Sequence, residues 1–182
     1  YFGDAWYDKV GRDSDTANVL SDNLFGYSKS TWKGSWSYNR GLIINPTLSL
    51  SAGKVCFLEC RNPDLIKDSS GRETTRDLWN DIHAVCLDAT TGKTLWEKPF
   101  PKTLLRTETT GFIQVSYGSM TNEGFLVTLS EGDTTAEGKQ TGKGIFSYHY
   151  FDLSNGSLNF QSQTPWRTNH HGAHISHPVV YE

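Results

Sequence analysis

The sequence lacks the features that mark several common classes of protein. No uninterrupted apolar run approaches the roughly 18 residues needed to span a bilayer. The first residues, YFGDAWYDKVGRD, lack the basic and then apolar profile of a signal peptide. Lys and Arg total 17 against 20 Asp and Glu, and no basic stripe is dense enough to follow a phosphate backbone. The composition therefore predicts neither a membrane span nor a nucleic-acid partner.

Cysteine is also scarce. Cys56, Cys60 and Cys86 are too few for a disulfide-stapled miniprotein, and no CxxC pair occurs. Cys56 and Cys60 share one face of an expected strand, and Cys86 falls on the strand expected beside it. This arrangement would permit one cross-strand disulfide. Three buried thiols are the favoured interpretation, because free cysteine is commonly buried.

Aromatic residues are plentiful, at 13% of the chain with six Trp, and this balance favours β structure. An internal repeat is the strongest signal. AVCLDATTGKTLW starts at Ala84, and YHYFDLSNGSLNF starts at Tyr148, about 64 residues later. An acid, a glycine and a large aromatic recur in register: Asp88, Gly92 and Trp96, then Asp152, Gly156 and Phe160. Each copy predicts a strand, a tight turn and a second strand.

Alternation of apolar and polar residues predicts two units of four strands. The first has strands near residues 42–48, 54–60, 82–88 and 94–98, and the second near 111–117, 124–129, 144–152 and 157–163. Residues 130–143 are expected to form a long loop. Units of four antiparallel strands are typical of propeller blades, so the expected fold is all-β. Residues 1–41 would hold the end of a preceding blade and a long connection, 42–110 one blade, 111–172 another, and 173–182 the first strand of a further blade. Such a chain is expected to be an incomplete fragment of a larger propeller.

The stretch CLDATTGKTLW resembles the blade repeat of quinoprotein-type propellers. These are the pyrroloquinoline quinone (PQQ) dehydrogenases and their non-catalytic PQQ-like relatives, whose blades carry Ala/Leu-Asp-Ala-x-Thr-Gly-x-x-x-Trp. The resemblance covers residues 42–182, and it implies a bacterial protein of the periplasm or the cell exterior. The repeat is a packing device found in enzymes and scaffolds alike, so it identifies the fold better than the activity.

Aromatic and basic residues interleave in FGYSKSTWKGSWSYNRG. Trp32, Trp36, Tyr38 and Arg40 could stack on a sugar, a quinone or a partner's side chain. Packing between blades is an equally good interpretation of the same residues.

Four of the six histidines stand in NHHGAHISHP. His171, His174 and His177 are candidate ligands of a transition metal, and Asn169 and His170 are candidate ligand-binding residues beside them. The spacing matches no zincin arrangement, and histidines that bond turn backbone are the favoured alternative. Residues 61–80 and Arg40 are expected on the same rim as this loop.

The favoured function is a PQQ-like propeller module that serves as a ligand-binding or protein-interaction scaffold. Its expected partners are the remaining blades or a partner chain, and a small-molecule or carbohydrate ligand. One alternative is part of a PQQ- and calcium-dependent alcohol or sugar dehydrogenase, and another is a metal- or carbohydrate-binding propeller. The calcium ligands and catalytic Asp of the dehydrogenases match no position here, and their vicinal cysteine pair is absent, so no catalytic residue is assigned.

Overall fold

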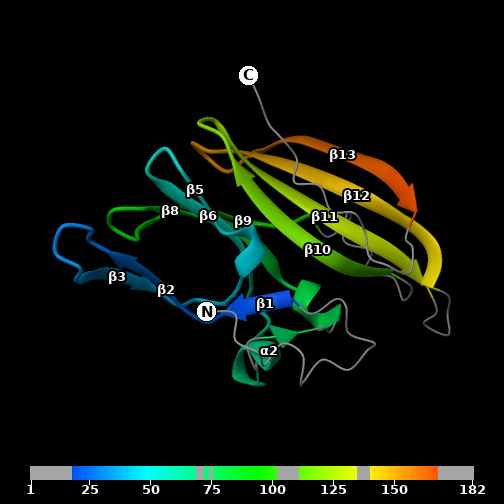
Figure 1. Cartoon of the computed structure of the whole chain (residues 1–182), viewed down its shortest axis with the longest axis horizontal. Coiled ribbons are helices and arrows are strands. Elements are labelled where there is room, and N and C mark those ends of the chain that lie inside the picture. Colours follow the sequence, from blue (N-terminus) through cyan, green and yellow to red (C-terminus); the bar gives the residue numbers. More distant parts are fainter. Residues whose placement is uncertain (1–17, 69–71, 74–75, 102–110, 135–139, 168–182) are drawn as a thin grey trace.

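The computed structural model describes residues 18–68, 72–73, 76–101, 111–134 and 140–167, and these residues are almost entirely β structure (Figure 1). The strands are β1 (Asn18–Ser21), β2 (Leu24–Tyr27), β3 (Gly34–Tyr38), β4 (Leu42–Ile44), β5 (Ser49–Ser51), β6 (Lys54–Cys60), β7 (Arg72–Glu73), β8 (Ile82–Asp88), β9 (Thr94–Pro99), β10 (Gly111–Met120), β11 (Gly124–Thr134), β12 (Gln140–Asp152) and β13 (Leu158–Arg167). The described helical elements are α2 (Pro63–Asp68) and the 3-10 turns η1 (Asn45–Thr47) and η2 (Arg76–Trp79). Within these described ranges, no helix is long and apolar enough to cross a membrane.

The first sheet has the order β7-β1-β4-β6-β8-β9, with β5 also paired to β6. Strands β4, β6, β8 and β9 are the four predicted from alternation in the first unit. The sheet differs from that prediction because β1 pairs with β4 through Leu20 and Ile44, and β7 pairs with β1. Part of the segment expected to belong to a preceding blade therefore extends this sheet, since the edge of β4 offers free backbone groups to a further strand.

The second sheet is a four-stranded antiparallel meander of β10, β11, β12 and β13. The predicted all-β fold is confirmed, and this second sheet is an antiparallel unit of four strands as expected. The long loop expected at residues 130–143 is a wrong prediction for most of that range. Strand β11 continues to Thr134 and β12 begins at Gln140, with Glu131 opposite Ile145 and Gly132 opposite Gly144. Backbone pairing extends these strands where the sequence loses its apolar alternation.

The main core lies between the two sheets. Along each strand alternate side chains point to one face, and the facing apolar sets are fully or almost fully buried. They include Leu42, Ile44, Leu58, Cys86 and Trp96 from the first sheet and Phe125, Val127, Leu129 and Phe151 from the second. All three cysteines are buried and free, as the favoured interpretation predicted. Cys56 lies directly opposite Cys86 on the neighbouring strand.

Strands β2 and β3 form a separate hairpin, which projects from the body of the molecule beside the first sheet (Figure 1). Its inward residues Leu24, Trp36 and Tyr38 pack with Phe57 and Val85 on the face of the first sheet that points away from the second. The first sheet is therefore covered on one face by the second sheet and on the other by this hairpin.

Three hairpin turns in the described part of the chain have the same backbone hydrogen bonds. The amide of Asp88 donates to Lys93 O and the amide of Gly92 donates to Asp88 O, each at 2.8 Å. The turn from Asp152 to Ser157 repeats both bonds at 2.8 and 2.9 Å, and the turn from Ser28 to Lys33 repeats them at 3.0 and 2.7 Å. The third copy was not recognised in the sequence, because Ser and Trp stand there in place of Asp and Gly.

The residue before the end of each turn has a left-handed backbone. Its φ is +69° at Gly92, +74° at Gly156 and +54° at Trp32. In the two glycine turns, the preceding aspartate binds the turn amides: Asp88 Oδ1 accepts from Thr91 N at 2.8 Å, and Asp152 Oδ1 accepts from Ser154 N at 2.7 Å. Hydrogen bonds from Thr91 and Ser154, respectively, are the main cause that lowers the pKa of the two carboxyl groups.

Candidate functional site

Two tryptophans make the same contact at successive junctions of the molecule. Trp36 Nε1 donates to Ala89 O at 3.1 Å, and Trp96 Nε1 donates to Leu153 O at 3.0 Å. Each accepting residue directly follows the aspartate of a glycine turn.

Both rings lie against the glycine of the turn that they contact. A Cβ added at Gly92 would lie 2.5 Å from the Trp36 ring, and one added at Gly156 would lie 2.6 Å from the Trp96 ring. Glycine at these two positions therefore provides the left-handed backbone and the space for an indole. Trp36, a sequence candidate for ligand binding, has a packing contact here.

Phe160 occupies the register of Trp96 in the second sheet. Phe160 pairs with Tyr150 as Trp96 pairs with Cys86. Phe160 is 54% exposed, whereas Trp96 is 6% exposed, and a phenyl ring has no N–H to donate. The indole contact of the first two junctions therefore has no counterpart at Phe160.

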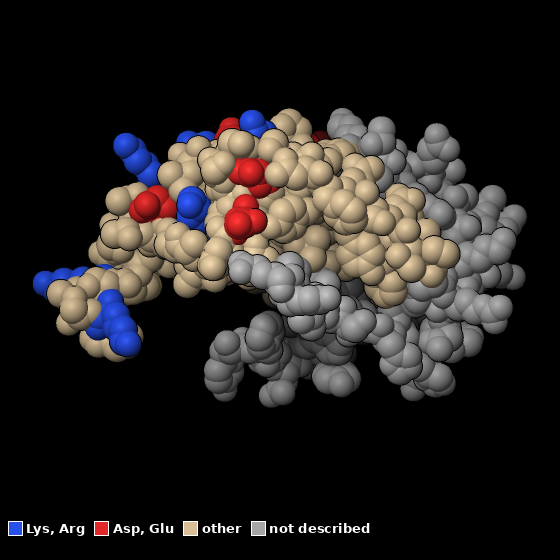
Figure 2. Space-filling view, turned by 90° about the horizontal axis from the view of Figure 1, so that it is seen from above, with Lys and Arg blue, Asp and Glu red and all other residues tan. Residues whose placement is uncertain are grey.

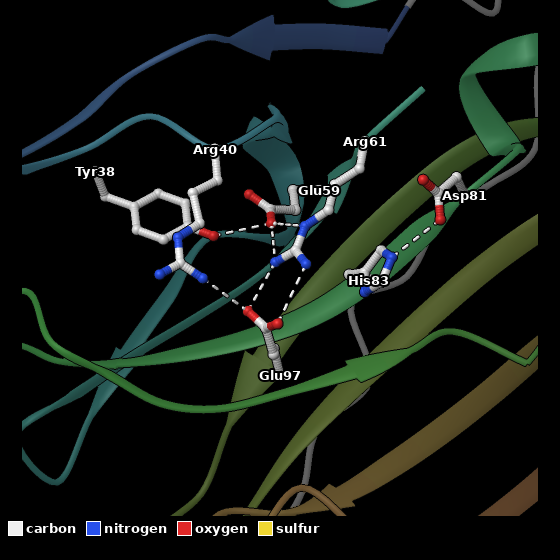
Figure 3. Close-up of polar contacts among 7 residues, drawn as sticks. All are labelled: Tyr38, Arg40, Glu59, Arg61, Asp81, His83 and Glu97. Carbon is white, nitrogen blue, oxygen red and sulfur yellow. Dashed lines mark hydrogen bonds and ion pairs between the residues drawn. The ribbon is translucent and has the colours of Figure 1, made fainter. Parts of the chain in front are cut away.

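A polar cluster lies on the hairpin-facing side of the first sheet, where β6 ends and β8 begins (Figure 3). Glu59 on β6 is fully buried, and its Oε1 accepts from the Tyr38 hydroxyl at 2.8 Å and from Arg61 Nε at 2.6 Å. Arg61 also binds Glu97 on β9 through both terminal nitrogens, at 3.3 and 2.9 Å. Arg40 donates to Glu97 at 3.1 Å and lies over the Tyr38 ring. We call these five residues the Glu59 cluster.

Arg61 and Glu97 each favour the charged form of the other. Burial opposes the charge on Arg61, but its hydrogen bonds to Glu97 and Glu59 outweigh burial and raise the guanidinium pKa. The hydrogen bond from Arg61 is the main cause that lowers the pKa of Glu97. Burial, followed by the charge of Glu59, raises the pKa of Tyr38 far above the usual tyrosine value, so its hydroxyl remains a donor at neutral pH.

One atom of the Glu59 cluster is left without a bond. Glu59 Oε2 is buried and has no hydrogen-bond partner in the described part of the chain. A buried carboxylate oxygen in this state carries a desolvation cost. The acids and bases of the cluster are otherwise engaged with one another, and Oε2 is enclosed among them.

Nearby, His83 on β8 bonds Asp81 through Nε2 at 3.0 Å (Figure 3). His83 is directly opposite Glu59 in the sheet register. No group of three or more His, Cys, Asp or Glu residues is arranged to hold a metal ion within the ranges that the structure describes.

The candidates from the sequence separate into four groups. Tyr38 and Arg40 come together in the Glu59 cluster, Trp36 lies at a junction, and Trp32 is exposed at the tip of the hairpin. Asn169, His170, His171, His174 and His177 lie outside the described residues.

Sequence reasoning missed Glu59, Arg61 and Glu97. The signal was present in KVCFLECR, where alternation places Glu59 on the same face as Phe57 and Val55. An acid at an inward position of an apolar strand predicts a buried partner, but not which partner, because Tyr38 and Glu97 come from other strands.

A second buried polar residue lies between the two sheets. His149 on β12 is fully buried, and neither ring nitrogen has a hydrogen-bond partner among the described residues. Its ring lies 4.6 Å from that of Phe100. Burial lowers the pKa of His149 to about 4, so the ring is neutral at physiological pH.

Comparison of the chain with models of known protein families gave no match. Comparison with curated protein sequences likewise found no relative.

Proposed function

We propose that this chain is a propeller-type module, built from PQQ-like blade units, that acts as a binding or protein-interaction scaffold. The observation that carries the proposal is the repeated junction: an indole of one unit donates to the turn of the next, first at Trp36 and Ala89 and again at Trp96 and Leu153. A contact repeated in this way is typical of arrays whose units are stabilised by their neighbours.

The chemistry of the described polar residues supports binding over turnover. The Glu59 cluster joins its acids and bases to one another in a single network of ion pairs and hydrogen bonds. The resemblance to PQQ-like repeats is the basis for proposing that the module works in the bacterial periplasm or outside the cell. Remaining blades or a partner chain are its proposed neighbours.

Hydrogen exchange on the full chain tests the modular proposal. Trp96→Ala should reduce amide protection in both sheets, because it removes the contact that couples them. Leu95→Ala is the matched control on the same strand, since Leu95 is 46% exposed and should leave protection in both sheets unchanged. Loss of protection confined to β9 in the Trp96 variant would overturn the coupled-unit proposal.

A titration with PQQ and Ca²⁺ separates the scaffold from the dehydrogenase. We expect no saturable change in PQQ absorbance, and no reduction of an electron-accepting dye with ethanol or glucose. Saturable PQQ binding with dye reduction would replace the scaffold by a quinoprotein dehydrogenase.

A further inference from the structure

The outer face and the turn of the β2–β3 hairpin carry an unusual set of exposed side chains. Phe25 is 56% exposed, Tyr27 is 65% exposed and Trp32 is 78% exposed. Lys29 and Lys33 flank Trp32, and no acidic residue occurs between Asp22 and Glu59. Figure 2 shows basic side chains and no acidic ones on the projecting end of this hairpin. We call Tyr27, Lys29, Trp32 and Lys33 the hairpin tip.

The backbone conformation of Trp32 is unfavourable for a residue with a large side chain. It has a φ of +54° at the position where the two sister turns have glycine, and a bulky side chain is strained in that region. Its ring makes no hydrogen bond or ring contact with any described residue. Glycine would satisfy the same turn without strain, so the stability of the fold does not explain a tryptophan here.

The tryptophan also changes what this turn can contact. In the sister turns, the glycine leaves the space in which Trp36 and Trp96 lie. Trp32 has a side chain at the position where those turns have none, so this turn is not built to receive an indole in the same way. The exposed ring is available for a different kind of contact.

We propose that the hairpin tip is a docking surface for an anionic lipid membrane. Trp and Tyr are enriched at the level of lipid headgroups, where the ring is partly buried and its polar edge stays hydrated. Lysine beside such rings is attracted to anionic headgroups. The charge of the tip is complementary to that surface, because both of its charged residues are basic.

The shape of the hairpin favours a membrane over other partners. Small ligands bind in concave sites, whereas this tip projects from the body (Figures 1 and 2). Single-stranded nucleic acid is held in a basic groove that follows many phosphates, and the tip has two lysines. A protruding turn with aromatic rings can enter a bilayer interface without a large complementary surface. This proposal does not depend on the propeller assignment.

Vesicle sedimentation with the full chain tests the proposal. We use vesicles of phosphatidylcholine alone and vesicles with equal parts of phosphatidylcholine and phosphatidylglycerol. The chain should sediment with the anionic vesicles, and the bound fraction should fall as salt is added. Each of Lys29→Gln and Lys33→Gln should weaken binding about fivefold.

Trp32→Gly should reduce vesicle binding about tenfold or more, while its melting temperature stays equal to or above that of the wild type. Ala52→Gly is the matched control, because Ala52 also has a positive φ, of +47°, in an exposed turn. That control should leave vesicle binding unchanged. Together the two variants separate relief of backbone strain from loss of the ring.

Three outcomes would overturn the proposal. The wild type could fail to bind anionic vesicles, or Trp32→Gly could bind them as well as the wild type does. Alternatively, a soluble acidic polysaccharide such as alginate could bind with the same dependence on Trp32 while vesicles do not. That last result would assign the hairpin tip to carbohydrate.

Discussion

Trp36 and Trp96 make the same contact at two junctions, yet other buried side chains of the two junctions differ in kind. Lys54 pairs with Asp88 in the first sheet as Gly124 pairs with Asp152 in the second. Counting five residues along from Lys54 and from Gly124 places Glu59 and Leu129 at equivalent positions, and both are fully buried. The junction at Trp36 therefore has a carboxylate where the junction at Trp96 has an aliphatic side chain.

On the neighbouring strand the polar residue is at the Trp96 junction and the apolar residue is at the Trp36 junction. Val85 lies three residues before Asp88, and His149 lies three residues before Asp152. Val85 therefore packs at the Trp36 junction where a histidine packs at the Trp96 junction. The hydrogen bonds from the indoles to the backbone are the same at both junctions, whereas the side chains buried between the units differ. Replacing Glu59 should therefore affect the Trp36 junction, and replacing His149 should affect the Trp96 junction.

The largest expected effect is at Trp96. Trp96→Ala should lower the free energy of unfolding by about 3 to 5 kcal/mol, because it removes a buried ring from the core between the sheets. Trp36 is less buried, so Trp36→Ala should cost roughly half as much. Urea unfolding followed by circular dichroism measures both. A larger cost at Trp36 would reverse the ranking of the two junctions.

Arg61 provides the next largest effect. Arg61→Met should cost about 3 kcal/mol, because it leaves the buried Glu59 carboxylate without its main ionic partner. Adding Glu59→Leu to Arg61→Met should recover most of the loss, since leucine is the residue at the equivalent position of the other junction. Arg40→Met is the control and should change stability by less than about 1 kcal/mol, because Arg40 is exposed. Equal costs for the two arginine variants would show that burial of Glu59 does not matter.

His149 should make the second junction sensitive to acid. The folded pKa of His149 is lowered to about 4, below the ordinary 6.5, so the unfolded chain binds more protons between these values. Stability is therefore lost as the pH falls from about 6.5 to about 4, and the loss approaches about 3 kcal/mol. His149→Val, which copies Val85, should remove this part of the slope. Chemical unfolding at pH 7 and pH 4 measures the difference, and equal slopes for the variant and wild type would contradict it.

Local chemistry explains which parts of the fold could be predicted from the sequence. Asp88 and Asp152 bind amides two or three residues along the chain, so their turns are visible in short motifs. The turn of Ser28 to Lys33 has lost both diagnostic residues. It nevertheless has the same backbone hydrogen bonds. The contact of the nearby Trp36 with Ala89 is long-range, so a search for local motifs does not find it either.

The Glu59 cluster could be predicted only in part for a related reason. Tyr38 and Arg40 stood out because they lie in an aromatic and basic stretch, but their partners Glu59, Arg61 and Glu97 come from other parts of the chain. Long-range pairing brings these groups together. The strand extension over residues 130–134 and 140–143 has the same origin, since it follows from backbone pairing instead of side-chain pattern.

The smallest expected effects come from the indole N–H groups themselves. Trp36→Phe and Trp96→Phe each keep an aromatic ring but leave the carbonyl of Ala89 or Leu153 without its donor. Each variant should lose about 1 kcal/mol beyond any change from ring size, with the larger loss at Trp96 because its bond is buried and that of Trp36 is only partly buried. Phe160→Trp is the matched control in the opposite direction. Phe160 is 54% exposed, so adding an N–H there should change stability by less than about 0.5 kcal/mol. If both Trp→Phe variants unfold like the wild type, the N–H bonds are dispensable, and ring packing against Gly92 and Gly156 alone joins the units. A loss at only one of them would mean that the indole hydrogen bond contributes to stability at one junction and not at the other.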